Sequence, residues 1–292
     1  MKLCLACASR FATESWTCPD CGFSPDVDEG IPVFAPDLAG AVAGYENTMF
    51  DAHGGEQAER SFWTQARSSL IVWALGRYAR RPRRFLEVGC GTGAVLARLE
   101  RAFPDLELVG AEALVAGLHL AQRRLTRTAL MQFDATRIPF VADFDAVGAF
   151  DVIEHIAEDD QVLASMATAV RPGGVLLITV PQHQFLYGPA DVSARHVRRY
   201  ERRRLVGQIR RLGLDVECVT SFVALLFPAM AAVRLRSRWR GGEYDSAEDF
   251  TIGALNTLFR HITNLERWTI QQGVRWPFGG SLLMVARRPL AR

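Results

Sequence analysis

Lysine is nearly absent from this 292-residue chain, because Lys2 is the only lysine and the other basic side chains are arginine. Codon usage rich in G and C explains this bias more simply than selection for guanidinium chemistry, so a lone arginine indicates no site. An excess of charge is also absent, since 34 basic side chains are balanced by 32 acidic ones. Net charge alone therefore marks the chain as neither a nucleic-acid-binding nor a membrane-surface protein.

Long apolar runs are lacking as well. The longest, Phe222 to Val233, is shorter than the roughly 20 residues that a membrane-spanning helix requires, and it contains Pro228. The first residues reach Ser9 without the apolar stretch of a secretory signal. These absences predict a cytoplasmic protein with no transmembrane segment. With 49% apolar residues, the chain can still bury one large α/β core and one or two small attachments.

Four of the six cysteines lie close together at the beginning of the sequence. They form two C-x-x-C pairs, Cys4 with Cys7 and Cys18 with Cys21. In a reducing compartment such pairs are more often metal ligands than disulfides, and four thiolates suit tetrahedral zinc. Because sulfur would fill all four coordination positions, the zinc would be structural and not catalytic. The pattern resembles a short zinc ribbon over residues 1–36, with a redox pair or free thiols as the alternative.

Helix and strand patterns alternate through the rest of the chain. An apolar stripe with helical spacing, from Tyr45 through Phe50 to Tyr78, predicts a helical cover over residues 37–84. The strands expected after it are Phe85–Gly89, Leu106–Ala111, Ala129–Phe133, Phe144–Phe150, Val175–Val180 and one near Leu214–Thr220. The break Arg171–Gly174 indicates a helix stop before the fifth strand. This alternation predicts a mostly parallel sheet covered by helices on both faces.

A three-glycine turn follows the first of these strands. Gly89, Gly91 and Gly93 let the chain turn tightly, and the next helix then presents free N–H groups at its start. We therefore expect a polar ligand against bare backbone. The spacing of Gly89, Gly91 and Ala94 also satisfies the loose fingerprint of pyrophosphate binding, so the glycines alone leave a dinucleotide such as NAD open.

The acidic residues around this turn resemble those of class I S-adenosylmethionine (SAM) methyltransferases, of the bacterial methyltransferase domain 11/23 type. In that family one acid precedes the glycines, a second ends the next strand and a third follows the third strand. Glu87, Glu112 and Asp134 stand at these places here. The resemblance implies SAM in preference to NAD. It also implies a Rossmann-like class I methyltransferase sheet, mostly parallel with an antiparallel last strand, whose SAM-binding core covers residues 85–221.

Each acid has a physical role in this interpretation. Glu112 would accept hydrogen bonds from the ribose hydroxyls, Asp134 would accept from the adenine amine, and Glu87 would support the glycine turn. The alternative, that Glu112 and Asp134 are only solvated acids at strand ends, is weakened because all three acids occur in order beside a glycine turn. The residues expected to bind the cofactor are Glu87, Gly89, Cys90, Gly91, Gly93, Glu112, Asp134, Ala135 and Phe150.

Acceptor-binding residues are expected after the fourth strand. Asp151, Glu154 and His155 lie within five residues and resemble the acid-x-x-Glu-His run of quinone-biosynthesis O-methyltransferases. In that group these residues can bind a divalent metal, but Asp151 replaces the first Glu here, so a metal stays open. No Asn-Pro-Pro-aromatic tetrapeptide is present, which argues against methylation of exocyclic base amines. In the alternative interpretation, Glu154 and His155 cap and pack the next turn.

A second group of polar side chains follows the fifth strand, between residues 181 and 200. Methyl transfer to a hydroxyl requires alignment and a base with a pKa near neutrality, which favours histidine. His196 is the first candidate for that base, followed by His155 and His183, although a lone histidine is more often structural. The side chains expected to contact substrate are Asp151, Glu154, Tyr187, Arg199 and Tyr200.

Arginines and apolar residues dominate the last third of the chain. Residues 195–211 contain eight arginines, which indicate an amphipathic helix with a solvated basic side or a contact with an anionic partner. Residues 222–278 form an insert before a last strand within residues 279–292. The expected structure of this insert is a helical lid over the active site. Its first part, residues 222–240, also combines an apolar run with cations as an interfacial helix does, which leaves peripheral membrane contact open there.

The sequence as a whole predicts a SAM-dependent methyltransferase with an N-terminal zinc ribbon and a helical lid insert. The expected acceptor is a heteroatom, oxygen first, of a small or lipid-linked metabolite. One alternative is a zinc-ribbon rRNA methyltransferase whose arginines contact phosphate, although stacking aromatics are not interleaved with them. Nucleic acid is therefore the less favoured partner. A second alternative is a non-enzymatic scaffold or regulator with the SAM fold. The sequence identifies neither the acceptor nor the oligomeric state.

Overall fold

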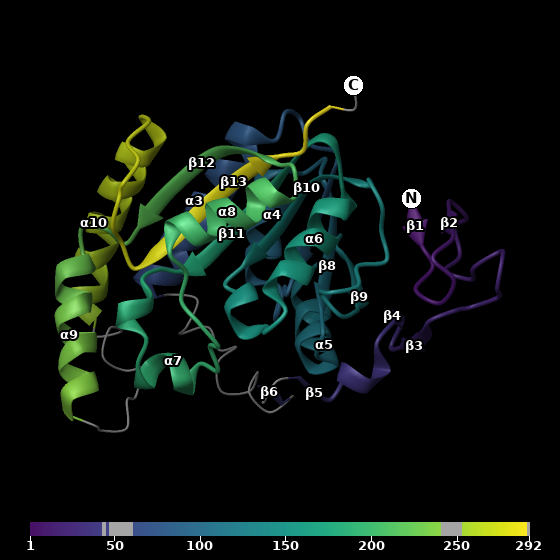
Figure 1. The fold of residues 1–292 in the computed structure, drawn as a ribbon, viewed down its shortest axis with the longest axis horizontal. Helices are drawn as coiled ribbons and strands as arrows, with labels where there is room; N and C mark the ends of the chain where they lie inside the picture. The colour runs from purple at the N-terminus through teal and green to yellow at the C-terminus, as the bar shows by residue number, and fades with distance from the viewer. Residues whose placement is uncertain (43–44, 47–60, 241–252, 291–292) are drawn as a thin grey trace.

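The computed structural model describes residues 1–42, 45–46, 61–240 and 253–290. At its centre these residues form a nine-stranded sheet with the order β12-β13-β11-β10-β7-β8-β9-β4-β3 (Figure 1). The strands of the core are β7 (Arg84–Val88), β8 (Glu107–Glu112), β9 (Ala129–Gln132), β10 (Phe144–Phe150), β11 (Val170–Pro181), β12 (Asp215–Phe222) and β13 (Ser281–Arg287).

Parallel pairs make up the middle of this sheet. β10 pairs with β7 and β11, β7 with β8, and β8 with β9, all in parallel, whereas β13 lies antiparallel between β11 and β12. Every residue of β10 is buried, as expected for a central strand covered on both faces. The predicted Rossmann-like sheet with an antiparallel last strand is confirmed.

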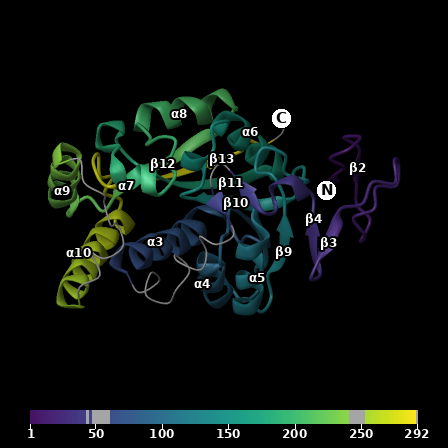
Figure 2. The same ribbon diagram turned by 90° about the horizontal axis from the view of Figure 1, so that it is seen from below.

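Helices cover both faces of the sheet (Figure 2). One face carries α3 (Phe62–Tyr78), α4 (Ala94–Ala102) and α5 (Val115–Arg124), and the other carries α6 (Asp159–Ala169) and α8 (Arg202–Arg211). Successive side chains of β7 enter different cores, because neighbouring residues of a strand point to opposite faces. Phe85 packs in the cluster that contains Leu75 and Leu96, whereas Leu86 packs in the cluster that contains Leu163.

The predicted helical cover over residues 37–84 is only partly helical. Within that segment α3 is the one α-helix among the described residues, and it begins after Ser61, whose Oγ accepts the N–H of Thr64 at 3.2 Å. Tyr45 instead belongs to a short antiparallel pair, and glycines in this stretch of the sequence disfavour a helix. The paired strands are β5 (Ala41–Val42) and β6 (Tyr45–Glu46). Phe50 lies outside the described residues.

The glycine-containing break before the fifth strand also differs from the expectation. β11 already begins at Val170, so Arg171–Gly174 belong to the strand and do not precede it. The pairing with β10 moves from Phe144↔Val170 to Ala146↔Val175, which is an irregularity of the register. The break is thus accommodated as a bulged start of the strand, since glycine tolerates the bend that a bulge requires.

The N-terminal segment is joined to the sheet. Its strands are β1 (Lys2–Leu3) and β2 (Arg10–Phe11), which pair with each other, and the hairpin β3 (Asp26–Asp28) and β4 (Ile31–Val33). Val33 pairs in parallel with Gln132 at the end of β9, so this hairpin extends the central sheet. Trp16 packs edge-on against Phe34 and Phe140, with ring centroids 4.7 and 5.4 Å apart. The segment in which the sequence predicts a zinc ribbon therefore continues into the core sheet.

The insert forms two helices, α9 (Phe227–Arg240) and α10 (Gly253–Gln271), at the opposite end of the molecule from the N-terminal segment (Figure 1). α10 packs on α3, where the rings of Phe62 and Phe259 lie 5.2 Å apart and Oδ1 of Asn256 accepts the N–H of Phe62 at 2.8 Å. None of the helices in the described part of the chain is both long and apolar enough to cross a membrane.

Candidate active site

The carboxyl end of β7 leads directly into the three-glycine turn. Gly89, Gly91 and Gly93 have φ angles of 71°, 51° and 76°, a region that favours glycine. A Cβ on Gly89 would lie 2.4 Å from Cγ2 of Val152, and one on Gly93 would lie 2.8 Å from Cδ1 of Leu125. Side chains are therefore excluded from this turn, and its backbone is left bare beside the start of α4, as a ligand-cradling turn requires.

Glu112 ends β8 beside this turn. One of its carboxylate oxygens accepts the N–H of Gly91 at 3.0 Å, and the other accepts the N–H groups of Ala113 and Leu114 at 2.9 and 3.3 Å. Burial raises the pKa of Glu112, while these N–H groups act in the opposite direction. The carboxylate thus lies at the carboxyl edge of the sheet, where ligands bind in folds of this kind.

Glu87 is buried inside β7, below the glycine turn. The residue is only 3% exposed, and its Oε2 has no hydrogen-bond partner among the described residues. Burial raises the pKa of Glu87 to about 8, the charge of Arg67 acts against this rise, and the charge of Glu112 adds to it. Near neutral pH this carboxyl group therefore retains its proton much of the time.

Arg67 is a site residue that the sequence did not identify. Its guanidinium lies 4.6 Å from the ring centroid of Trp63 on α3, and Nη1 donates to Oδ2 of Asp151 at 2.6 Å. The two partners are 84 residues apart in the chain. Because arginine is the ordinary basic residue of this sequence, no local signal distinguished Arg67 from the others.

Asp151 directly follows β10 in the left-handed region, with a φ angle of 58°. Besides the bond from Arg67, its Oδ2 accepts the hydroxyl of Thr179 in β11 at 3.0 Å, and its N–H donates to the carbonyl of Thr179 at 2.9 Å. Asp151 therefore ties the ends of two neighbouring strands together at the carboxyl edge of the sheet.

The remaining predicted cofactor residues surround the same edge. Asp134 follows β9, and its Oδ1 accepts the N–H of Thr136 at 2.8 Å. Cys90 is buried in the glycine turn, where burial raises the pKa of its thiol well above the ordinary value. Phe150 is 4% exposed at the end of β10, and Ala135 is partly buried against the core. All four lie at the ends of strands that reach this edge or in the turns beyond them.

Glu154, His155 and His196 form a compact polar cluster on the acceptor side. One ligand atom from each lies within 4.8 Å of the others, and the imidazole centroids of the two histidines are 4.8 Å apart. Asp151 is not part of this group, because Arg67 and Thr179 hold its carboxylate. A His–His–Glu set of this size is compatible with a divalent cation or with proton exchange among its members.

Burial controls the charge of this cluster. Glu154 is fully buried, and neither of its carboxylate oxygens has a hydrogen-bond partner in the described part of the chain. Burial and the charge of Asp151 raise the pKa of Glu154 well above its usual value. Burial and the nearby His196 lower the pKa of His155 to about 4. At neutral pH, His155 is therefore uncharged and Glu154 favours its protonated form.

Asp191 in α7 (Pro189–Ser193) orients His196. Its Oδ1 accepts from Nδ1 of His196 at 2.9 Å and from Nε of Arg199 at 2.8 Å, while its Oδ2 accepts from Nη1 of Arg234 at 3.1 Å. With Nδ1 bonded to a carboxylate, Nε2 is the ring atom of His196 left to accept a proton. The His196 side chain is 16% exposed, whereas that of Asp191 is fully buried. The Asp191–His196 pair thus has the arrangement of an oriented general base.

Tyr187 and Arg199 support the Asp191–His196 pair. The hydroxyl of Tyr187 donates to the carbonyl of His196 at 2.7 Å. Arg199 also donates to the carbonyl of Gln182 at 3.0 Å, and burial together with Arg234 lowers its pKa to about 10. The structure therefore brings both predicted residues to the site as neighbours of His196.

Tyr200 and His183 lie outside the polar cluster. Tyr200 is fully buried, and its hydroxyl donates to Oδ2 of Asp159 at 2.7 Å, so the prediction that it contacts substrate is replaced by a role in the core. A buried tyrosine hydroxyl that donates a hydrogen bond to a buried carboxylate stabilises the packing of the core. His183 is buried among the rings of Phe227 and Phe278, with centroids 5.1 and 5.8 Å away, beside the insert.

Several of the clustered arginines contact other parts of the protein, although Arg195, Arg203, Arg204, Arg210 and Arg211 are exposed. Arg198 and Arg204 form ion pairs with Asp159 at 2.9 and 3.0 Å. Arg202 donates to the carbonyl oxygens of Val219 and Trp276 at 3.1 and 2.6 Å. These contacts join α8 to Asp159 of α6 and to β12, and guanidinium groups that are already paired offer fewer contacts to phosphate.

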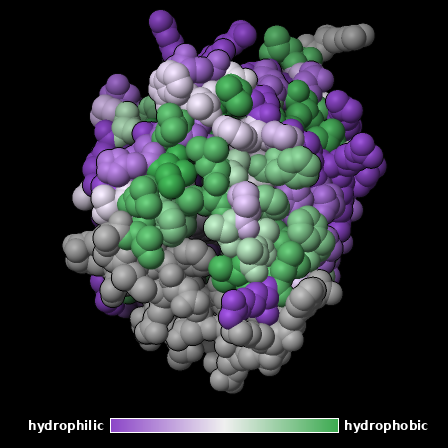
Figure 3. Space-filling model, turned by 90° about the vertical axis from the view of Figure 1, so that its left-hand side faces the viewer, coloured by the Kyte–Doolittle hydropathy of each residue, from purple (hydrophilic) through white to green (hydrophobic). Residues whose placement is uncertain are grey.

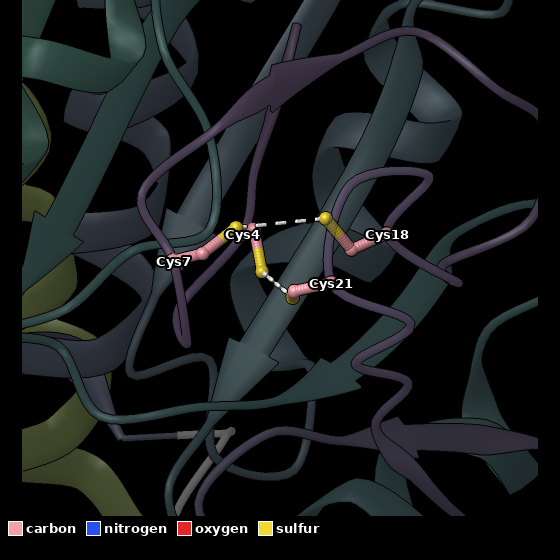
Figure 4. Close-up of side chains that lie close together, drawn as sticks. All are labelled: Cys4, Cys7, Cys18 and Cys21. Atoms are coloured by element: carbon pink, nitrogen blue, oxygen red, sulfur yellow. Dashed lines mark hydrogen bonds between the residues drawn. The ribbon is translucent and has the colours of Figure 1, made fainter.

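The four N-terminal cysteines converge in space (Figure 4). Sγ of Cys4 lies 3.6 Å from Sγ of Cys21, and Sγ of Cys7 lies 3.7 Å from Sγ of Cys18. All four sulfur atoms lie within 4.8 Å of one another. Four sulfurs around tetrahedral zinc at about 2.3 Å would be about 3.8 Å apart. The positions and the chemistry of these thiols therefore fit one zinc ion.

Comparison with known proteins decides the family. The profile of the methyltransferase-domain family matches residues 62–219, more than half of the chain. The chain belongs to the methyltransferase-domain family. The glycine turn and its acidic neighbours, from which the sequence predicted this family, lie within the matched residues. The match begins at α3 and ends within β12, so it covers neither the N-terminal segment nor the insert.

Individual relatives of this methyltransferase agree with the family. It is 31% identical over 142 residues to a ubiquinone biosynthesis O-methyltransferase of Mesorhizobium japonicum, a match that covers 42% of this chain and 55% of that protein. It is 30% identical over 175 residues to phthiotriol/phenolphthiotriol dimycocerosates methyltransferase 1 of Mycobacterium ulcerans, covering 55% of this chain and 64% of that one. The chain thus spans between half and two thirds of the length of these two curated relatives.

Solved structures show the same fold. A chain of the complex between the Haloferax volcanii Trm112 methyltransferase activator and a methyltransferase superposes with a TM-score of 0.57 at 16% identity. This match covers 84% of the present methyltransferase and 98% of that chain. At such low identity the likeness concerns the fold alone.

Proposed function

We propose that this methyltransferase transfers the methyl group of SAM to a hydroxyl oxygen of a small or lipid-linked metabolite, with His196 as the general base. The Asp191–His196 pair carries this proposal, because it places an oriented, partly exposed imidazole beyond the end of β11 and next to Glu154. The names of two relatives, a ubiquinone biosynthesis O-methyltransferase and a phthiotriol dimycocerosates methyltransferase, support an acceptor of this class.

The residues around the glycine turn fit the cofactor. Gly89 and Gly91 supply backbone in the left-handed region with no side chain of its own, Glu112 offers carboxylate oxygens for the ribose hydroxyls, and Asp134 offers acceptors for the adenine amine. Glu87 lies below the turn and supports it from within β7. When bound, SAM supplies a methyl group activated by its sulfonium, so the protein need only align the partners and remove a proton.

His196 then has one chemical task. As the bond between the methyl carbon and the acceptor oxygen forms, the carbon–sulfur bond breaks and its electron pair stays on sulfur. The hydroxyl proton passes to Nε2 of His196, while Asp191 stabilises the imidazolium through Nδ1. His155 remains uncharged because of its low pKa, so it adds no positive charge that would oppose this transfer.

His196→Gln tests the assignment directly. With full-length protein, turnover should fall by about 10²- to 10⁴-fold, while the dissociation constant of S-adenosylhomocysteine, measured by calorimetry, stays within twofold. His119→Gln is the matched control, because His119 lies on α5 with its Nε2 3.2 Å from a carboxylate oxygen of Asp28 in β3, and it is not part of the cluster of Glu154, His155 and His196. Unchanged turnover in His196→Gln would refute the base assignment.

The acceptor class needs a separate test. Transfer of labelled methyl from SAM into extract of the source cell, with RNA, protein and organic-soluble pools counted separately, identifies the pool that is methylated. Label in the organic-soluble pool is the expected result. Label in RNA would overturn the proposal in favour of an RNA methyltransferase, and bound cofactor without label in any pool would favour a scaffold or regulator.

We also propose that Cys4, Cys7, Cys18 and Cys21 hold one structural zinc ion. The proposal is supported by the sulfur–sulfur distances of 3.6 and 3.7 Å and by the small apolar cluster around them. Four thiolates leave no open coordination position, so the ion would stabilise the segment and take no part in the transfer. Metal analysis of the purified protein should find one zinc per chain, which Cys18→Ser should abolish.

A surface of α9 and α10 supports contact with lipid. Figure 3 shows apolar side chains gathered on this end of the molecule. Among the described residues this apolar face consists of Leu225, Val233, Leu235, Leu255, Leu258, Leu265 and Trp268, each at least 39% exposed. Arg236 and Arg260 are exposed beside it, whereas the acid of α10, Glu266, is buried and accepts the N–H groups of Ala224 and Leu225. Apolar side chains flanked by cations suit an anionic bilayer surface.

Vesicle sedimentation tests this contact. The protein should bind phosphatidylglycerol-containing vesicles more tightly than pure phosphatidylcholine, and Trp268→Asp should weaken binding by at least fivefold. Val27→Asp is the control, because Val27 is 69% exposed on β3 at the other end of the molecule. Equal binding by both variants would refute the role of the apolar face.

A further inference from the structure

Gln132, the last residue of β9, joins two segments of the chain through its buried side chain. It is fully buried, and its Nε2 donates to the carbonyl oxygens of Ala35 at 2.7 Å and of Ala113 at 2.8 Å. Its Oε1 accepts the N–H of Ala35 at 2.9 Å. Both amide donors are thus used, each on a different segment, and a fully satisfied buried amide holds its partners in a unique arrangement.

The two segments lead to different sites. Ala35 lies two residues beyond β4, the strand that attaches the N-terminal segment to the sheet. Ala113 lies directly after Glu112 and donates its own N–H to the Glu112 carboxylate, whose other oxygen accepts the N–H of Gly91. A continuous series of hydrogen bonds therefore runs from Ala35, at the end of the N-terminal segment that carries the cysteines (the cysteine segment), through Gln132, to the glycine turn.

Further hydrogen bonds join the cysteine segment and the residues just after it to the loop that follows β8 and to the loop that follows β9. The N–H of Val115 donates to the carbonyl of Ala39 at 3.1 Å, beyond β8. Nη2 of Arg137 donates to the carbonyl of Leu5, between two cysteines, at 2.7 Å. Arg137 lies three residues after Asp134, so the cysteine segment also contacts the loop that carries this acid.

The loops that carry the four cysteines have a small buried cluster of their own, which contains Cys4, Phe11 and Cys18, with Trp16 and Phe23 packed beside them. The segment is also attached to the core, because Trp16 packs against Phe34 and Phe140 and the N–H of Leu3 donates to the carbonyl of Pro139. The small cluster is not enough to fix the cysteine loops by hydrophobic burial alone, so a bound metal would add to their order. Loss of that metal would therefore loosen the segment whose far end Gln132 holds.

We propose that Gln132 is a positioning residue that couples zinc binding at the four cysteines to SAM binding. The ordered segment holds Ala35, Gln132 holds Ala113 relative to it, and Glu112 is thereby kept where the ribose hydroxyls bind. This inference rests on the zinc site and the cofactor roles proposed above. Because linkage between two binding equilibria is reciprocal, the cofactor must strengthen zinc binding by the same factor.

The experiment uses the full-length protein with its zinc content measured first. The dissociation constant of S-adenosylhomocysteine should rise about tenfold when zinc is removed with a chelator, within the usual range of coupling. Competition between the protein and a zinc indicator should shift by the same factor when S-adenosylhomocysteine is present. In Gln132→Met, which keeps the side-chain volume and removes the three hydrogen bonds, both factors should fall to within twofold of one.

Gln122→Met is the matched control. Nε2 of Gln122 donates to the carbonyl of Glu29 at 3.2 Å and so links α5 to the same hairpin, on the exposed surface and away from the glycine turn. This variant should keep the full coupling factor. A merely structural role of Gln132 would lower the melting temperature and leave the coupling factor unchanged, and that result would overturn the proposal.

The remaining outcomes distinguish a failure of the proposed zinc site from a failure of the proposed coupling. Protein that binds no zinc would overturn the zinc site and this inference with it. Zinc binding with equal S-adenosylhomocysteine affinity in both metal states would overturn the coupling alone. Hydrogen exchange of the wild-type protein gives an independent measurement: zinc removal should speed the exchange of the N–H groups of Gly91, Ala113 and Leu114 and leave α8 unchanged. Unaltered exchange at these three groups would contradict the proposal even if Gln132→Met fails to fold.

Discussion

Replacing Glu87 by Gln should make the folded protein more stable at alkaline pH. Burial raises the pKa of Glu87 from 4.5 to about 8, partly offset by the charge of Arg67 and increased by that of Glu112. Between these two pH values the folded protein keeps a proton that the unfolded chain releases. The contribution of the protonated Glu87 to the free energy of unfolding is therefore greatest below pH 4.5 and is lost as the pH rises through 8. Glu87→Gln has no proton to lose in this range.

The size of the effect follows from the two pKa values. One pH unit corresponds to about 1.4 kcal/mol, so the difference between 4.5 and 8 amounts to about 5 kcal/mol over the whole window. Between pH 5 and pH 9, the free energy of unfolding of Glu87→Gln should rise relative to the wild type by about 4 kcal/mol. The isosteric amide preserves packing, so most of this change comes from the proton.

Urea unfolding of both proteins without cofactor, at pH 5, 7 and 9, measures this difference. Glu100→Gln serves as a control of opposite sign. The Glu100 carboxylate accepts N–H groups of Thr126, Arg127 and Thr128, which lower its pKa, so this replacement should cost stability at pH 7 and less below pH 4. Parallel pH profiles for Glu87→Gln and the wild type would refute the claim that Glu87 is buried in its protonated form.

Three further changes probe the site. Gly89→Ala should abolish S-adenosylhomocysteine binding in calorimetry because of the 2.4 Å approach to Val152, whereas Gly213→Ala, with a φ angle of 72° and nothing within 4 Å, should only lower stability by about 1 kcal/mol. Asp191→Asn should reduce turnover about 10²- to 10⁴-fold with cofactor affinity unchanged, and equal turnover would exclude an oriented base. Arg67→Met should cost about 3 kcal/mol in urea unfolding, since it leaves a mostly buried carboxylate without its cation, and a loss below about 1 kcal/mol would show that pair to be dispensable.

The parts of the fold that the sequence predicted are those with local signals. β10 occupies Phe144–Phe150, as expected, because a run that is apolar apart from Asp145 and is bounded by Asp143 and Asp151 indicates a buried strand. The glycine turn was recognisable because positive φ angles and close approach leave no other residue type. The two C-x-x-C pairs were equally recognisable, because cysteine is reactive and such close pairs usually have a chemical role.

Non-local contacts account for the features that the sequence did not predict. Arg67 meets Asp151 across 84 residues, and arginine is too frequent in this chain to mark such a pair. Val33 ends a short hairpin whose sequence contains no indication that it will pair with Gln132. Tyr200 lies in a polar stretch that suggests a binding loop, yet the buried carboxylate of Asp159 draws its hydroxyl into the core. These outcomes are decided by tertiary packing and not by local preference.

The hairpin of the N-terminal segment also determines where the sheet stops. Without it, β9 would present unpaired backbone N–H and C=O groups at an open edge, and such edges recruit strands from other molecules. β4 pairs with the last residue of β9, Gln132, and the strand that then lies outermost, β3, has only three residues, Asp26–Asp28. Two of these carry a negative charge. A short, charged border resists strand addition, so the segment that carries the cysteines also makes this end of the sheet a poor template for edge-to-edge pairing.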